Sequence, residues 1–226
     1  VYKRQGRSAV AYAAYCSGTK LYDKEVRKTY NYTGQNSVVH SEINLPQNAP
    51  SEFYDREKLW NAVHEIETRS DAQLAREVEV ALPREFIRQE QIDTVREYIM
   101  KNFVREGMCA DWALHDKRDG NPHAHIMLTT RAFTRNGKWA EKSRTIYKLD
   151  PNGQKVPLID PETGEQKVRV RKGKGVEKLW QTEKVPANDW NDRSKAEEWR
   201  AAWATECNPV SYTHLPAHET DSYLVC

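Results

Sequence analysis

Residues 108–131 carry the sequence pattern that most restricts the fold, because they form two alternating segments joined by a tight turn. In 108–115 and again in 122–131, apolar and polar side chains alternate with the period of two that is typical of a strand. Asp119 and Gly120, which lie between the segments, are a hairpin turn signal. We therefore predict an antiparallel hairpin whose apolar side chains share one face: Ala110, Trp112, Leu114, Ala124, Ile126 and Leu128.

Six further segments have the spacing of regular elements. Residues 75–82 alternate strictly and predict a half-buried strand, and residues 37–45 predict a strand that ends at Pro46. Apolar residues at helical spacing, or an alanine-rich composition, predict four helices. These helices are expected at 8–21, 54–69, 90–106 and 188–208.

These elements predict an α+β fold of two layers. A central antiparallel sheet carries helices 54–69 and 90–106 on its apolar face and leaves its polar face open. A length of 226 residues fits one main domain. We expect a core at 6–134, a basic extended arm or hairpin at 135–187, and a C-terminal helix of the same domain at 188–208.

Bulk composition excludes some classes of protein and leaves nucleic-acid binding open. Charged residues make up 30%, but Lys plus Arg exceed Asp plus Glu only by 35 to 33, so net charge does not identify a nucleic-acid binder. The four cysteines form no CxxC pair, which argues against a zinc ribbon or a disulfide framework. The chain has no run of 18 apolar residues and no signal peptide, so we expect a cytoplasmic protein without a membrane segment.

Three histidines are the strongest candidates for chemistry. His115 lies on one arm of the predicted hairpin, and His123 and His125 lie on the other, so the period of two places all three on the polar face. Such a set can bind a divalent ion and leave coordination positions open for a phosphate or water. A lone histidine on a strand is more often a surface residue, but three on one face favour a metal site.

The residue that acts with such a metal is less clear from spacing alone. Glu77 or Glu79 can serve as a general base, although alternating glutamates are often only a solvated strand face. Tyr15 lies in an alanine-rich helix, where tyrosine is usually a core residue, and its hydroxyl needs a base or a metal to become a nucleophile. A zinc hydrolase also remains open at this point.

Four segments together resemble the MobA/MobL relaxases of mobilisable and conjugative plasmids. They are GRSAVAYAAYCSG, VVHSEINLPQNAP, LAREVEVALP and HDKRDGNPHAHIMLTTR, and the resemblance runs from residue 6 to about residue 208. It implies a relaxase or replication-initiator-like fold. It also implies site- and strand-specific DNA nicking and rejoining at a plasmid origin of transfer, which initiates conjugative mobilisation.

The resemblance also implies roles for individual residues. Tyr15 stands at the position of the nucleophile that forms a 5′-phosphotyrosine link and leaves a free 3′-hydroxyl. His115, His123 and His125 match a metal-binding triad for Mg²⁺ or Mn²⁺, and Glu77 matches an acidic position that acts as a base or orients the tyrosine. The implied partners are single-stranded or supercoiled DNA at the origin, relaxosome accessory proteins and a conjugative coupling protein.

Basic residues suggest where DNA phosphates bind. One lies on the histidine face and the others in the arm, where the alternative is a merely solvated surface. The candidates are Arg131, Lys167, Arg169, Arg171, Lys172 and Lys174.

Two other interpretations use the same residues. A rolling-circle replication initiator shares the tyrosine chemistry, and a non-catalytic DNA-binding fragment would keep the triad only for structure. Residues 1–5 and 209–226 resemble translated sequencing-adapter read-through, so we expect these ends to be non-native and the first strand of the fold to be missing.

Overall fold

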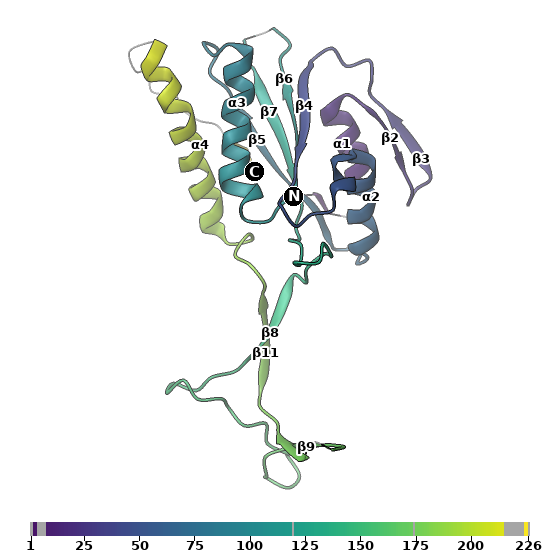
Figure 1. Ribbon diagram of the computed structural model, residues 1–226, viewed down its shortest axis with the longest axis vertical. Helices are drawn as coiled ribbons and strands as arrows, with labels where there is room; N and C mark the ends of the chain where they lie inside the picture. Colours follow the sequence, from purple (N-terminus) through teal and green to yellow (C-terminus); the bar gives the residue numbers. More distant parts are fainter. Residues whose placement is uncertain (1, 4–7, 119, 174, 215–223, 226) are drawn as a thin grey trace. The chain divides into compact units, whose positions relative to one another are not determined.

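The computed structural model describes residues 2–3, 8–118, 120–173, 175–214 and 224–225. The chain divides into two compact units, Val1–Ala140 with Trp190–Cys226, and Glu141–Asp189. Figure 1 shows the helices and the main sheet of the first unit and the thin ladders of the second.

The first unit is built on an antiparallel sheet, as the alternating segments predicted. Within the described residues, its strands follow the order β1-β5-β7-β6-β4, and β12 also pairs with β5. The hairpin of β6 and β7 pairs Trp112 with Ile126 and His115 with His123, so its apolar and polar faces fall as expected. The strands are β1 (Tyr2–Lys3), β4 (Val38–Asn44), β5 (Gln73–Ala81), β6 (Ala110–His115), β7 (His123–Leu128) and β12 (Leu224–Val225).

Both end segments contribute a short strand to this sheet. Tyr2 of β1 pairs with Ala75, and Leu224 of β12 pairs with Val80, so both strands lie against β5. We expected the first strand of the fold to be missing, whereas Tyr2–Lys3 form a short first strand, β1. That the two ends are non-native stays a prediction.

One face of the sheet packs against α3 (Arg88–Ile99) and α4 (Arg193–His214) (Figure 1). A π-helical turn, η2 (Met100–Val104), extends α3, and Gly107 follows it with a φ of 104°. Burial of apolar side chains between these helices and the sheet contributes roughly 25 cal/mol to the free energy of folding per Å² of apolar surface. The buried cluster includes Val78, Val80, Val95, Phe103, Trp112, Ile126, Leu128, Trp199 and Trp203.

The opposite face is also covered, which corrects the predicted two-layer arrangement with helices on one face. Helices α1 (Ala9–Ser17) and α2 (Arg56–Ile66) pack on the histidine face near its Cys109 and Met127 end (Figure 1). A short 3₁₀ turn, η1 (Ser51–Tyr54), precedes α2. Periodicity shows that a helix has an apolar side, but it does not show which face of a sheet receives that side.

Small side chains let α1 approach the sheet closely. Ala9, Ala13 and Ala14 are 0–1% exposed, and the helix begins at the N-cap Ser8, whose side chain accepts a hydrogen bond from the Ala11 N–H. Gly18 ends the helix in the left-handed conformation, with a φ of 63°. A hairpin that the sequence did not predict follows, formed by β2 (Lys20–Asp23) and β3 (Lys28–Asn31).

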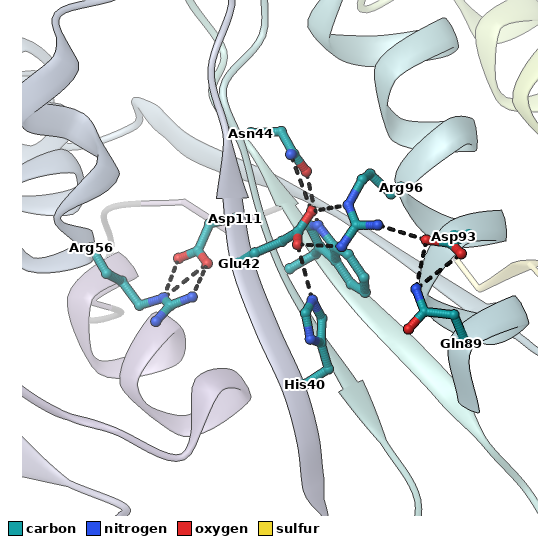
Figure 2. Close-up of polar contacts among 9 residues, drawn as sticks. His40, Glu42, Asn44, Arg56, Gln89, Asp93, Arg96 and Asp111 are labelled. Carbon is teal, nitrogen blue, oxygen red and sulfur yellow. Dashed lines mark hydrogen bonds and ion pairs between the residues drawn. The ribbon is translucent and has the colours of Figure 1, made fainter.

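Buried and half-buried polar side chains join the helices to the sheet (Figure 2). On the face of α3, Glu42 of β4 receives two hydrogen bonds from Arg96, at 2.8 and 2.9 Å. Burial opposes ionisation of Glu42, but hydrogen bonds from Arg96, His40 and Asn44 outweigh it and hold the pKa of this carboxyl below its usual value. On the opposite face, Asp111 of β6 is bound by Arg56 of α2.

Asp111→Ala is expected to destabilise the first unit strongly. Asp111 is 4% exposed and accepts hydrogen bonds from the Arg56 guanidinium and, at 2.7 Å, from the Trp60 indole N–H. Its loss leaves both donors unpaired in the interior, which costs about 3–5 kcal/mol. Denaturant unfolding measures this change. The control is Asp71→Ala, which breaks an exposed pair with Arg69 and should leave the free energy of unfolding nearly unchanged. Equal losses in the two variants would contradict the prediction.

The second unit consists of antiparallel ladders. β8 (Ser143–Tyr147) pairs with β11 (Thr182–Pro186), and β9 (Val168–Arg171) pairs with β10 (Gly175–Lys178). No side chain in the described parts of this unit is buried. Backbone pairing rather than a hydrophobic core therefore holds it in shape.

Candidate active site

Three histidine rings meet at one end of the β6–β7 hairpin. The ring centroids of His115, His123 and His125 lie 4.8–5.5 Å apart. Candidate ligand atoms of the three residues all lie within 4.8 Å of one another. His115 is buried and the other two are half-buried, so the cluster opens to solvent on the side of β7.

Each ring has one nitrogen held by a neighbouring oxygen. His115 Nε2 lies 2.6 Å from the Cys16 carbonyl, and His123 Nδ1 lies 2.9 Å from the Asn121 carbonyl. His125 Nδ1 lies 3.3 Å from a Glu77 oxygen. Each oxygen accepts a hydrogen bond, so the nitrogen that faces it carries a proton, and the other nitrogen of an imidazole in its neutral form has a lone pair. Metal-binding histidines have this arrangement.

The electrostatics of His115 also fit a ligand. Burial lowers its pKa, and the neighbouring His125 and His123 lower it further, whereas the hydrogen bond to the Cys16 carbonyl acts in the opposite direction. The net shift favours the neutral imidazole, which is the form that binds a metal. The donor set therefore fits a divalent cation.

Helix α1 ends against this cluster. The Cys16 carbonyl that binds His115 belongs to the last turn of the helix, and Tyr15 precedes it in the chain. Tyr15 is 42% exposed, which is unusual for a tyrosine in an alanine-rich helix. Its ring stacks on Tyr12 at 6.1 Å and meets Tyr32 edge-to-face at 5.6 Å.

Glu77 contacts a different tyrosine from the one expected. The Tyr12 hydroxyl donates a short hydrogen bond to Glu77, and the same carboxylate oxygen faces His125. Glu79 also lies near His125, at 3.8 Å. Glu77 thus reaches Tyr15 only through the ring of Tyr12. The sequence signal for Tyr12 was its position three residues before Tyr15, on the same side of the helix.

The predicted DNA-binding residues are placed in different surroundings. Arg131 is half-buried, and its guanidinium is paired with Glu67 at 2.7 Å and donates a hydrogen bond to the Ala140 carbonyl. In the second unit Lys167 pairs with Asp160 and Arg171 with Glu177, while Arg169 and Lys172 are exposed. Lys174 lies outside the described residues.

A sequence profile of the MobA/MobL family matches residues 7–221. The chain belongs to the MobA/MobL family. The resemblance carried by the four sequence segments is therefore confirmed.

Curated relatives of this MobA/MobL chain have names that refer to mobilization or conjugal transfer. It is 37% identical over 211 residues to the probable mobilization protein MobA of Bifidobacterium longum, covering 92% of this chain and 37% of that protein. It is 39% identical over 191 residues to the conjugal transfer protein TraA of Agrobacterium fabrum, covering 80% of this chain and 16% of that protein. The chain thus spans well under half the length of either relative.

A solved structure has the same fold as this MobA/MobL chain. It was described as the molecular basis of vancomycin resistance transfer in Staphylococcus aureus. The TM-score is 0.73 and the sequence identity is 29%, over 97% of this chain and 94% of that one. The predicted α+β class with a central antiparallel sheet is confirmed.

Among the described residues, no helix has the length and apolar character needed to cross a membrane.

Proposed function

We propose that this chain is the DNA-nicking domain of a plasmid mobilisation protein. It would cut one strand at an origin of transfer and later rejoin it. The observation that carries the proposal is the contact between the last turn of α1, which bears Tyr15, and the histidine cluster on the sheet. The last turn of α1, next to Tyr15, is bound through the Cys16 carbonyl to His115 of the histidine cluster. Membership of the MobA/MobL family supports it.

In the proposed step the Tyr15 oxygen attacks the scissile phosphorus. The new bond from oxygen to phosphorus forms as the bond to the 3′-oxygen breaks, the tyrosine proton leaves to a base, and the 3′-oxygen takes up a proton. The products are a 5′-phosphotyrosine and a free 3′-hydroxyl. Because the phosphotyrosyl bond keeps the energy of the phosphodiester, a 3′-hydroxyl can reverse the step without ATP.

The surrounding residues would place the reacting groups. His115, His123 and His125 would hold the divalent ion, which when bound supplies positive charge to the non-bridging phosphate oxygens. Mg²⁺ or Mn²⁺ is the expected ion. Tyr12 and Tyr32 hold the ring of Tyr15 from two sides. Arg169 and Lys172 of the arm are exposed and would contact phosphates.

The test is a denaturing gel. The chain is incubated with Mn²⁺ and single-stranded oligonucleotides carrying candidate origins of transfer, and a protein band that retains the DNA label identifies the covalent product. Free ends without such a band would favour a metal-assisted hydrolase. An origin of replication cut in preference to an origin of transfer would favour a replication initiator.

Tyr12→Phe is expected to slow this reaction without abolishing it. The substitution removes the hydroxyl that binds Glu77 but keeps the ring that stacks on Tyr15. Loss of such a supporting hydrogen bond typically costs about tenfold or more. The measurement is the rate of adduct formation at saturating DNA. Tyr54→Phe, at an exposed position in η1, is the control. An unchanged rate of adduct formation in Tyr12→Phe would show that the hydrogen bond from Tyr12 to Glu77 does not support the reaction.

A further inference from the structure

Tyrosine rings form a continuous surface beside the site. We call Tyr12, Tyr15 and Tyr32 the tyrosine row. Tyr12 and Tyr15 are stacked with an interplanar angle of 24°, whereas Tyr15 and Tyr32 are nearly perpendicular, at 85°. A perpendicular pair covers at most one ring face. Tyr15 is 42% exposed, and Tyr12 and Tyr32 are half-buried because they also pack against the buried cluster around α1 and α2. The row therefore presents aromatic surface to solvent next to the proposed nucleophile.

The hairpin that carries Tyr32 adds positive charge to this surface. Tyr32 continues the β2–β3 ladder, because its N–H donates to the Thr19 carbonyl. Tyr30, two residues earlier, lies under the ammonium group of Lys28, which is 5.0 Å from the ring centroid. Four of the nine exposed residues in 20–31 are basic and one, Glu25, is acidic, while Asp23 is fully buried. The basic residues are Lys20, Lys24, Arg27 and Lys28.

We propose that the tyrosine row and Lys28 form a binding surface for unpaired bases of single-stranded DNA, with Tyr32 as a stacking platform. Aromatic rings stack on any base, and lysine attracts the phosphates that link the bases. Bases inside a duplex are already stacked on one another and would not reach these rings. The surface would hold the nucleotides that flank the scissile phosphate, which rests on the proposed function.

The test measures DNA affinity separately from cleavage. Binding is followed by fluorescence anisotropy in a Tyr15→Phe background, which keeps the ring but cannot form an adduct, with an oligothymidine of about 16 nucleotides as the probe. Tyr32→Leu keeps apolar packing and removes the aromatic face, so it is expected to weaken binding about 5- to 150-fold. Tyr32→Phe should bind like the parent. Tyr22→Leu, on the opposite face of the same hairpin, is the matched control.

Two further measurements distinguish a loss of base stacking from a folding defect in the variant. An abasic deoxyribose-phosphate oligomer of equal length should bind the parent and Tyr32→Leu equally, because it offers no bases to stack. Lys28→Ala, at an exposed position, should reduce the slope of log affinity against log salt by about one. Unchanged oligothymidine affinity in Tyr32→Leu, an equal loss on the abasic oligomer, or an unchanged salt slope in Lys28→Ala would overturn the proposal.

These outcomes are independent of those that test nicking. A chain that binds oligothymidine through Tyr32 but forms no adduct with any origin would contradict the proposed function and leave the stacking surface in place. If the parent chain forms the adduct but Tyr32→Leu binds oligothymidine with unchanged affinity, the proposed function is supported and the stacking surface is contradicted.

Discussion

Tyr15→Phe is expected to abolish the covalent protein–DNA product, lowering its rate of formation by at least about a thousandfold. The substitution removes only the hydroxyl, so the ring still stacks on Tyr12 and still meets Tyr32. The backbone of α1, including the Cys16 carbonyl that binds His115, is unchanged. The measurement is the yield of labelled adduct on a denaturing gel at saturating DNA and Mn²⁺.

Tyr22→Phe is the matched control, because Tyr22 is 40% exposed and Tyr15 is 42% exposed. This variant should form adduct at the parental rate. If cleavage with an adduct survives Tyr15→Phe, the attacking residue is another one, and mass spectrometry of the adduct will locate it. If the parent chain binds DNA but never cleaves it, the non-catalytic interpretation gains support.

The double substitution His123→Ala with His125→Ala is expected to remove the metal site. Two of the three candidate imidazole ligands are lost, while His115 keeps its hydrogen bond to the Cys16 carbonyl and so keeps α1 in place. We expect Mn²⁺ affinity to fall by more than about 100-fold, and adduct formation to fall with it. Isothermal titration calorimetry measures the first change and the gel assay the second.

His40→Ala controls for the loss of a histidine. His40 lies on β4 and packs on Trp112, on the face opposite the cluster, with Glu42 as its partner (Figure 2). This variant should bind Mn²⁺ like the parent. Unchanged Mn²⁺ affinity in the double variant would place the metal elsewhere. A large drop in melting temperature together with unchanged adduct formation would show that the triad is structural.

Alternation and helical spacing predicted strands β4 to β7 and helices α2 to α4, because period two and period 3.6 are properties of the local sequence. The side of the sheet that each helix covers was predicted wrongly for α2. That choice depends on partners far apart in the chain, such as Arg56 and Asp111. The β2–β3 hairpin escaped prediction because its alternation is masked by polar residues, and only Leu21 and Asp23 of β2 are buried.

In the candidate site, too, local sequence pattern predicted which residues share a face but not which long-range contacts they make. The three histidines were expected on one face, and the structure brings their nitrogens within reach of one ion, although metal binding itself stays a prediction. Glu77 was expected to serve Tyr15, whereas its contact is with Tyr12. Sequence spacing within a strand or a helix orients side chains reliably, but it does not show how a helix lies across a sheet. The contact between Tyr12 and Glu77 depends on that crossing.

The small volume of the alanines in α1 affects where Tyr15 lies relative to the three histidines. Ala13 and Ala14 are buried in the cluster that joins α1 to α2 and to Cys109 and Met127 of the sheet region, and Ala14 directly precedes Tyr15. A larger side chain at either position would lift the helix, since a packed interior has little room to absorb added volume. The Tyr15 hydroxyl and the Cys16 carbonyl would then move away from the histidines together. The distance between the proposed nucleophile and the candidate metal site would thus be set by side-chain volume at residues that have no proposed part in the chemistry.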